Sequence, residues 1–367
     1  MKRYFFYLVF INSINNIIIF LPRVILHDQY HGSIMAIIFS IPFGTILLYL
    51  FMKSIINFPN KAFPEILSIT LPRWAQISIM LFICSLWYIS GFFMLLALIQ
   101  MVQRFIFFKM SEYILLAVLV LVLLWAIRTD GLTIFHSLEI FLVIIVPMIL
   151  FIFAKAIFNH YFSWDSCLEV VTHTFSIPTL TSYAVTTYMF TGYTDMLIFN
   201  KFFNKENFQL KHIWIFPLVE LFLLTFAFFI PIGFLGTQQA SSFNYPWLAA
   251  TDCISIKIGV IERTLFIYIL LFFFTAIINI IIHWYVSFEL INDMFKFQIK
   301  PNKIQRIHWY ILSAFGIIPF LLIGVFKNEE ALFSSGTVWL ILRLFAELIV
   351  VGLVILTAYR AKKKGAT

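Results

Sequence analysis

The chain has 367 residues, of which 62% are hydrophobic and 11% charged, whereas a soluble domain carries about 25% charged residues. This small number of polar side chains cannot cover the core of a soluble protein of this length. The excess apolar side chains must therefore face lipid. The net charge of +8 would suit a nucleic-acid-binding protein, but the basic residues are distributed as a membrane topology requires.

Ten apolar runs follow one another along the chain. A hydrocarbon core of about 30 Å needs about 20 helical residues per crossing, and unalternating runs of this length are helices. They cover residues 5–24, 33–56, 77–103, 113–128, 135–157, 180–200, 213–235, 262–287, 308–326 and 337–359. The sequence therefore predicts an all-α polytopic membrane protein with about ten transmembrane helices, forming one membrane domain over residues 1–367. Short interfacial helices are expected at 165–176 and 247–257.

The Lys and Arg residues are divided unequally between the two sides of this topology. Ten crossings place both termini on one side, and that side carries 17 of the 25 basic residues. The opposite side carries seven, and Arg343 lies within the last run. Because cytoplasmic loops are enriched in Lys and Arg, both termini are predicted to be cytoplasmic. The basic charge indicates topology, and we expect no nucleic-acid partner.

Motifs for catalysis or metal binding are weak. No HExxH, P-loop or Gly-rich phosphate motif occurs, and Cys84, Cys167 and Cys253 lack the spacing of metal ligands. His160 and Asp165 have the His-x4-Asp spacing of some acyltransferases, but this spacing arises easily by chance and no partner motif accompanies it. We expect no enzymatic activity, no cofactor and no metal.

Two runs are unusually polar. The first contains Asn12, Ser13, Asn15 and Asn16, and in the sixth the segment 186–195 contains four Thr, a Gly and an Asp. Interrupted helices at matching places in two halves are typical of transporters built from inverted repeats around a midplane site. The pattern predicts a 5+5 inverted repeat, approximately 5–157 and 180–359, with helices one and six broken. The alternative is that Asn and Thr only join neighbouring helices by hydrogen bonds.

Three local motifs carry a family resemblance. They are Leu21-Pro22-Arg23, Phe190-Thr191-Gly192-Tyr193, and the stretch from Tyr245-Pro246-Trp247 to Gly259-Val260-Ile261-Glu262-Arg263. In these motifs, and in length and spacing of runs, the chain resembles the spore germination permease family. Its members are the B subunits of nutrient germinant receptors, in the amino acid/polyamine/organocation (APC) superfamily. Asn15 and Asn16 stand where relatives tend to have glycines, which leaves the ligand open.

The resemblance implies a LeuT/APC-like fold and a small nutrient ligand, with an amino acid favoured. It also implies partners: an A subunit with cytoplasmic domains and a C subunit lipoprotein, in the inner membrane of a dormant spore. The alternative is an active transporter that moves amino acids with protons or sodium, since a fold does not fix a function. A third hypothesis is that the chain is a structural scaffold within a membrane complex.

Broken helices expose backbone amides that attract a carboxylate and carbonyls that attract an ammonium group. We therefore expect the ligand to lie between helices one and six. The third helix lies across the centre in the superfamily fold, and the eighth carries two polar residues one turn apart. The candidate ligand-binding residues are Asn12, Asn15, Asn16, Tyr88, Phe92, Thr187, Phe190, Thr191, Gly192, Thr275 and Asn279; for each one, the alternative is a packing role.

Charged residues within the runs are candidates for gating or ion coupling. A charge at mid-bilayer costs roughly 2.5–3.5 kcal/mol on insertion scales, so such groups face protein or water and tend to pair. Arg343 and Glu347 lie four residues apart and share a helix face, which predicts either an intrahelical ion pair or a gating role. Glu220 is a single carboxylate that could take part in the movement of a proton or a cation. Asp195 lies close to the break in the sixth run, and the alternative to a functional role is that its side chain reaches toward the cytoplasm.

Overall fold

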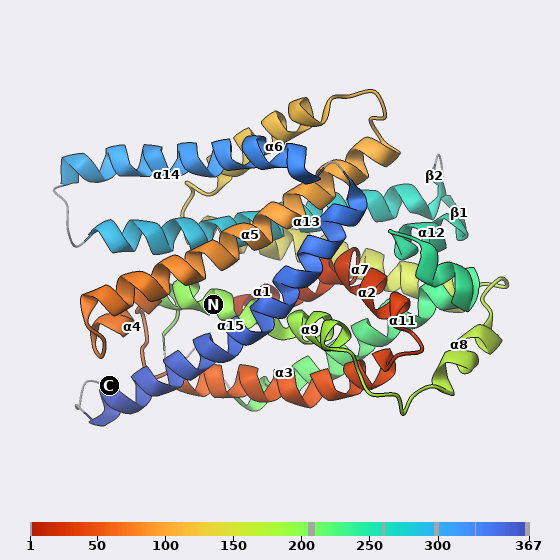
Figure 1. Cartoon of the computed structure of the whole chain (residues 1–367), viewed down its shortest axis with the longest axis horizontal. Helices are drawn as coiled ribbons and strands as arrows, with labels where there is room; N and C mark the ends of the chain where they lie inside the picture. Colours follow the sequence, from red (N-terminus) through yellow and green to blue (C-terminus); the bar gives the residue numbers. More distant parts are fainter. Residues whose placement is uncertain (1, 205–209, 259–260, 297–300, 327, 364–367) are drawn as a thin grey trace.

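The computed structural model describes residues 2–204, 210–258, 261–296, 301–326 and 328–363. Most of the long helices run along the longest dimension of a single bundle (Figure 1). The α-helices are α1 Lys2–Asn16, α2 Phe20–His27, α3 Ser33–Ile55, α4 Phe63–Ser68, α5 Arg73–Phe105, α6 Glu112–Ala126, α7 Gly131–Ile157, α8 Trp164–Val171, α9 Leu180–Tyr188, α10 Met196–Phe199, α11 Ile215–Ser242, α12 Pro246–Asp252, α13 Thr264–Lys296, α14 Pro301–Leu322 and α15 Glu329–Lys363.

Short elements complete the described part of the chain. The 3₁₀ helices are η1 Met189–Asp195, η2 Asn200–Phe202, η4 Leu210–His212 and η5 Ile323–Phe326, and the strands are β1 Ser255–Ile258 and β2 Ile261–Arg263. The strands form an antiparallel hairpin. Residues 259 and 260, which belong to the third sequence motif, lie outside the described residues. Helices α8 and α12 begin where short helices were expected, but they end at Val171 and Asp252, about five residues before the predicted ends, and β1 takes up part of the second segment.

Each predicted apolar run falls on helical structure. Within the described ranges, seven helices are long and apolar enough to cross a membrane, and the bent pair α1–α2 brings the number to eight. The two remaining runs fall on α6, which has 15 residues, and on the interrupted segment α9–η1–α10. The prediction of an all-α polytopic membrane protein is confirmed, whereas the number of ten crossings is not.

The first predicted break lies between α1 and α2, whose axes differ by 53°. Pro22 has no N–H, so it cannot donate the helical hydrogen bond to the carbonyl of Ile18. The side-chain amide of Asn16 donates to the Asn12 carbonyl oxygen at 2.8 Å and competes with the backbone for it. These two features lie on either side of residues 17–19, where the first helix is interrupted, as its polarity predicted.

The second predicted break lies in the sixth run, where α9 gives way to the more tightly wound η1 and then to α10. Gly192 lies in η1 against α1. A Cβ atom at Gly192 would collide with the Leu8 carbonyl oxygen and lie 2.7 Å from Val9 Cα. The absence of a side chain therefore lets η1 and α1 cross with their backbones in direct contact. The predicted break in helix one is confirmed by the bend, whereas helix six is interrupted by 3₁₀ winding over η1 and continues into α10.

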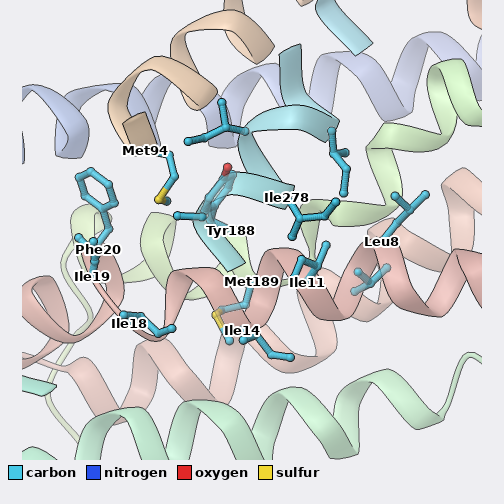
Figure 2. Packing of buried hydrophobic residues seen from close by; sticks show 14 of the residues in the cluster. Leu8, Ile11, Ile14, Ile18, Ile19, Phe20, Met94, Tyr188, Met189 and Ile278 are labelled. Carbon is cyan, nitrogen blue, oxygen red and sulfur yellow. The ribbon is translucent and has the colours of Figure 1, made fainter. Parts of the chain in front are cut away.

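Helix α1 lies in the core of the bundle, where its apolar side chains are covered on several sides. Figure 2 shows Ile14 of α1 beside Met189 and Ile11 beside Ile278 of α13, with Leu8 further along the same helix. Both termini lie in the left half of Figure 1, whereas α8, α12 and the hairpin lie at the opposite end.

The close crossing at Gly192 makes a prediction about stability. Gly192→Ala should lower the free energy of unfolding by about 1–3 kcal/mol, because a backbone must shift to admit the methyl group. Gly352→Ala on α15 is the matched control, because no atom lies within 4 Å of its Cβ position. Thermal unfolding of both purified variants in detergent measures the difference; equal midpoints would contradict the close crossing.

Candidate functional site

The two breaks are joined by hydrogen bonds from α1. The side-chain amide of Asn12 donates to the Tyr188 carbonyl oxygen at 2.9 Å and lies 3.3 Å from that of Met189. It also lies 3.4 Å from the Thr191 hydroxyl oxygen. The Thr191 hydroxyl also donates to the Tyr188 carbonyl oxygen, at 2.9 Å. Asn12 of the first broken helix thus adds a buried side-chain donor to the carbonyls where α9 passes into η1.

A second contact from α1 brings a third helix to the same place. The Ser13 hydroxyl oxygen lies 3.0 Å from the Met189 carbonyl oxygen and forms a short hydrogen bond with the carboxyl group of Glu220 on α11. Glu220 is fully buried. Helices α1, η1 and α11 therefore meet at a polar cluster beside the first break.

A small cavity lies next to the breaks, between α5, α9 and α15. It has a volume of about 20 Å³ and is lined by Asn16, Phe20, Ser90, Phe93, Met94, Tyr188, Gly336, Trp339 and Leu340. Figure 2 shows Phe20, Met94 and Tyr188 around this region. The hydroxyl groups of Ser90 and Tyr188 are hydrogen-bonded at 2.9 Å. This volume holds about one water molecule, so the site is closed to larger ligands in this conformation.

An unsatisfied amide lies close to this cavity. The side-chain nitrogen of Asn15 is 3.3 Å from the Met94 sulfur. The side-chain oxygen of Asn15 is buried with no hydrogen-bond partner among the described residues. Buried polar atoms without partners are rare in proteins. Asn15 therefore provides an acceptor that is free for a ligand or a water molecule.

The second half of η1 is held by other helices. Three successive residues each have a polar partner: the Tyr193 hydroxyl donates to Glu347 at 2.5 Å, and Arg343 donates to the Thr194 hydroxyl at 2.9 Å. The Trp87 indole N–H donates to Asp195 at 2.6 Å. Within the described contacts Arg343 and Glu347 do not form the intrahelical ion pair that was one alternative. Instead both residues fasten α15 to η1.

An open cavity of about 530 Å³ is lined in part by α12, which lies in the right half of Figure 1. Its lining includes Arg104, Asn244, Tyr245 and Asp252. Tyr245 contacts Phe333 with ring centroids 5.6 Å apart, and Phe333 contacts Phe20 at 5.5 Å. Because Phe20 also lines the small cavity, a chain of three aromatic side chains separates the two cavities.

The remaining candidate residues lie in other surroundings. The hydroxyls of Thr187 and Thr275 donate to carbonyls of their own helices, and the Asn279 carbonyl bonds to His283 in the next turn of α13. Phe190 packs over Gly44 of α3.

The two candidates on α5 point away from the breaks. Tyr88 donates to the Phe315 carbonyl oxygen at 3.0 Å, and with Phe92 it lines an apolar groove between α5 and α14. Of the candidates, the structure brings Asn12, Asn15, Asn16, Thr191 and Gly192 together. Ser90, Tyr188 and Trp339 line the small cavity and were missed. A Ser in an aromatic-rich run was the available signal for Ser90.

Two interrupted helices that cross at the centre of a helical bundle, with a cavity between them and their neighbours, define a membrane protein of the transporter type. The chain belongs to the family of spore germination proteins, whose sequence profile matches residues 1–331. No curated protein matches the chain.

Among solved structures, the chain is similar to a Na⁺-coupled sialic acid symporter in its substrate-bound outward-open state. The TM-score is 0.55 at 12% sequence identity, and the match covers 89% of this chain and 75% of the symporter. At this identity the likeness shows the fold alone. The fold is therefore that of the APC/LeuT type, as expected.

The ends of α2 and α9 are also tied together, in the loop region near α8. Asp28 accepts hydrogen bonds from the hydroxyls of Thr179 at 2.5 Å and Ser182 at 2.9 Å, and Thr179 caps the N-terminus of α9. Burial opposes ionisation of Asp28, but the hydrogen bonds from Thr179, His27 and Ser182 outweigh it and lower the pKa of this carboxyl below its usual value.

This lowered pKa predicts an acid-sensitive contribution to stability. The contribution is complete above the pKa of the unfolded state and is lost as the pH falls through the lower folded value. Asp28→Asn should lower the free energy of unfolding by about 1–2 kcal/mol at neutral pH and flatten this part of the pH profile. Unfolding midpoints between about pH 7 and pH 3 measure it; parallel profiles for both proteins would refute the assignment.

Proposed function

We propose that this chain is the ligand-binding B subunit of a nutrient germinant receptor. It binds a small nutrient, an amino acid above all, between the broken helices and signals through A and C partner subunits. In this proposal the two halves, approximately 5–157 and 180–359, are inverted repeats, and both termini are cytoplasmic in the inner membrane of the spore. One observation supports this proposal above the others. Asn12 joins the two interrupted helices, a cavity lies beside them, and the chain belongs to the family of spore germination proteins.

The chemistry of the site supports a ligand without net charge. Among the described residues no charged side chain lines the small cavity, and its polar groups are the neutral ones of Asn16, Ser90, Tyr188 and Trp339. A zwitterion suits this setting, because broken helices offer backbone amides to its carboxylate and carbonyls to its ammonium group. The unpaired carbonyl oxygen of Asn15 is a further acceptor for the ammonium group.

Ligand entry requires a movement, because about 20 Å³ cannot hold an amino acid. In the proposed route the ligand first occupies the open cavity of about 530 Å³. The contacts of Phe333 with Tyr245 and Phe20 must then separate. A ligand shifts this equilibrium only by the difference in its affinity for the two states. In a receptor, the partner subunits read the position of α2 and α15.

The alternative function is proton- or sodium-coupled transport of the same ligand. The fold of the symporter neighbour favours it, but receptors and transporters can share a fold. In that case the helices move further until the ligand is released on the cytoplasmic side, and the ligand appears inside proteoliposomes.

Spores that lack this chain test the proposal. We expect them to lose dipicolinic acid release in response to one nutrient class in a panel of amino acids and nucleosides. Reintroducing Ser85→Leu, on the exposed face of α5, should restore the response. Ser90→Leu should not, because it fills the cavity and weakens binding at least tenfold, which is about 1.4 kcal/mol. Unchanged release in the deletion strain, together with uptake by proteoliposomes, would favour the transporter.

A further inference from the structure

Glu220 and Ser13 form a buried hydrogen-bonding cluster next to the first break. One carboxyl oxygen of Glu220 contacts the Ser13 hydroxyl, and the other has no hydrogen-bond partner among the described residues. The same hydroxyl oxygen lies 2.9 Å from the Val9 carbonyl oxygen and 3.0 Å from that of Met189. A single hydroxyl group thus faces three oxygen atoms.

The number of hydrogen atoms decides how this cluster can bond. A serine hydroxyl has one hydrogen to donate and two lone pairs to accept with. If Glu220 were ionised, all three oxygens around Ser13 would be acceptors competing for that hydrogen. The second carboxylate oxygen would also be buried with nothing to bond, and an uncompensated buried charge is far more costly than a buried neutral group.

A protonated Glu220 resolves the conflict. Its O–H donates to the Ser13 oxygen, and the Ser13 hydrogen is then free for the carbonyl of Met189 or Val9. The partnerless oxygen becomes the carbonyl oxygen of a neutral acid. Two hydrogen atoms are then shared among the three contacts of Ser13, in place of the single one that an ionised Glu220 would leave.

No neighbouring cation offers an alternative partner to the carboxyl group. Helix α11 packs against α1, α2, α3, α7, α8, α12 and η1, and in the described contacts none of their titratable or charged side chains bonds to Glu220. These side chains are Arg3, Tyr4, Tyr7, Arg23, His27, Tyr49, Lys53, His136, Glu139, Lys155, Asp165, Cys167, Glu169, Tyr193, Asp195 and Asp252.

We propose that Glu220 is a proton-binding site that locks α1 onto η1 through Ser13. When the bundle opens, Glu220 gives its proton to water, and the Ser13 hydroxyl turns from the Met189 carbonyl to the new carboxylate. Met189 thereby loses a donor at the break that Asn12 also holds. Proton release and movement of the broken helices are therefore coupled. This consequence for the ligand rests on the proposed function, whereas the protonation of Glu220 does not.

Infrared spectroscopy of the purified full-length protein, without ligand, tests the protonation state. The wild-type spectrum at neutral pH should contain a C=O band of a neutral carboxylic acid that is lost in Glu220→Gln. Glutamine keeps the shape and donates to Ser13, so the fold should persist. Glu139→Gln is the control, because Glu139 is ion-paired with Arg3 at 2.7 Å and should lose a carboxylate band. Loss of a carboxylate band in Glu220→Gln would overturn the proposal.

A second variant and a second ion sharpen the test. Ser13→Ala should shift the frequency of the same acid band, because it removes the acceptor of the Glu220 proton. The competing hypothesis is a sodium site. It would be supported, and the proton site refuted, if Glu220 were ionised and if sodium chloride raised the unfolding midpoint above that in choline chloride for the wild type but not for Glu220→Gln. In spores, Glu220→Gln should flatten the pH dependence of the nutrient response. If the pH dependence of the nutrient response stayed unchanged in Glu220→Gln spores while the infrared result was positive, only the coupling to the ligand would be refuted.

Discussion

The hydrogen bonds from Asn12 to the end of α9 are the contacts on which the centre of this protein depends. Lipid offers no hydrogen bonds to backbone groups, so a change of helical winding within a membrane is stabilised by donors from the protein. Asn12 supplies such a donor to Tyr188 and Met189, and Gly192 lets the two backbones approach closely enough. The positions of α1 and η1 are therefore fixed relative to each other.

Segment η1 is held from two sides by different parts of the bundle. Its beginning is bonded to α1 through Asn12 and Ser13, and its end is bonded to α15 and α5 through Glu347, Arg343 and Trp87. The small cavity lies between these two sets of contacts, where α15 meets α5 and α9. Any opening of the cavity must move α15 relative to α1 or α5. In our proposal this is the movement that a receptor transmits and that a transporter cycles through.

Polarity within the apolar runs predicted the breaks, because Asn, Thr and Gly in a membrane helix need a structural reason. The same reasoning placed Asn12, Asn16 and Gly192 at the crossing. It could not place Tyr88 and Phe92, because helical periodicity tells which residues share a face but not which neighbour covers that face. Those two side chains lie towards α14, and Ser90 on the same helix faces the cavity.

Arg343 and Glu347 show the same limit. Their spacing predicted a shared face of the last helix and suggested an ion pair, but their partners come from a segment about 150 positions earlier in the chain. Long-range contacts of this kind depend on how the helices are arranged.

The most direct test of the ligand site is chemical labelling of a cysteine at position 90. The native Cys84, Cys167 and Cys253 are first replaced by Ala, and Ser90→Cys or, as control, Ser85→Cys is introduced. Each nutrient that triggers dipicolinic acid release is then added before a small thiol reagent. The account predicts that an effective nutrient slows labelling at position 90 and leaves position 85 unchanged. Equal labelling of position 90 with and without saturating nutrient would contradict a ligand site between the broken helices.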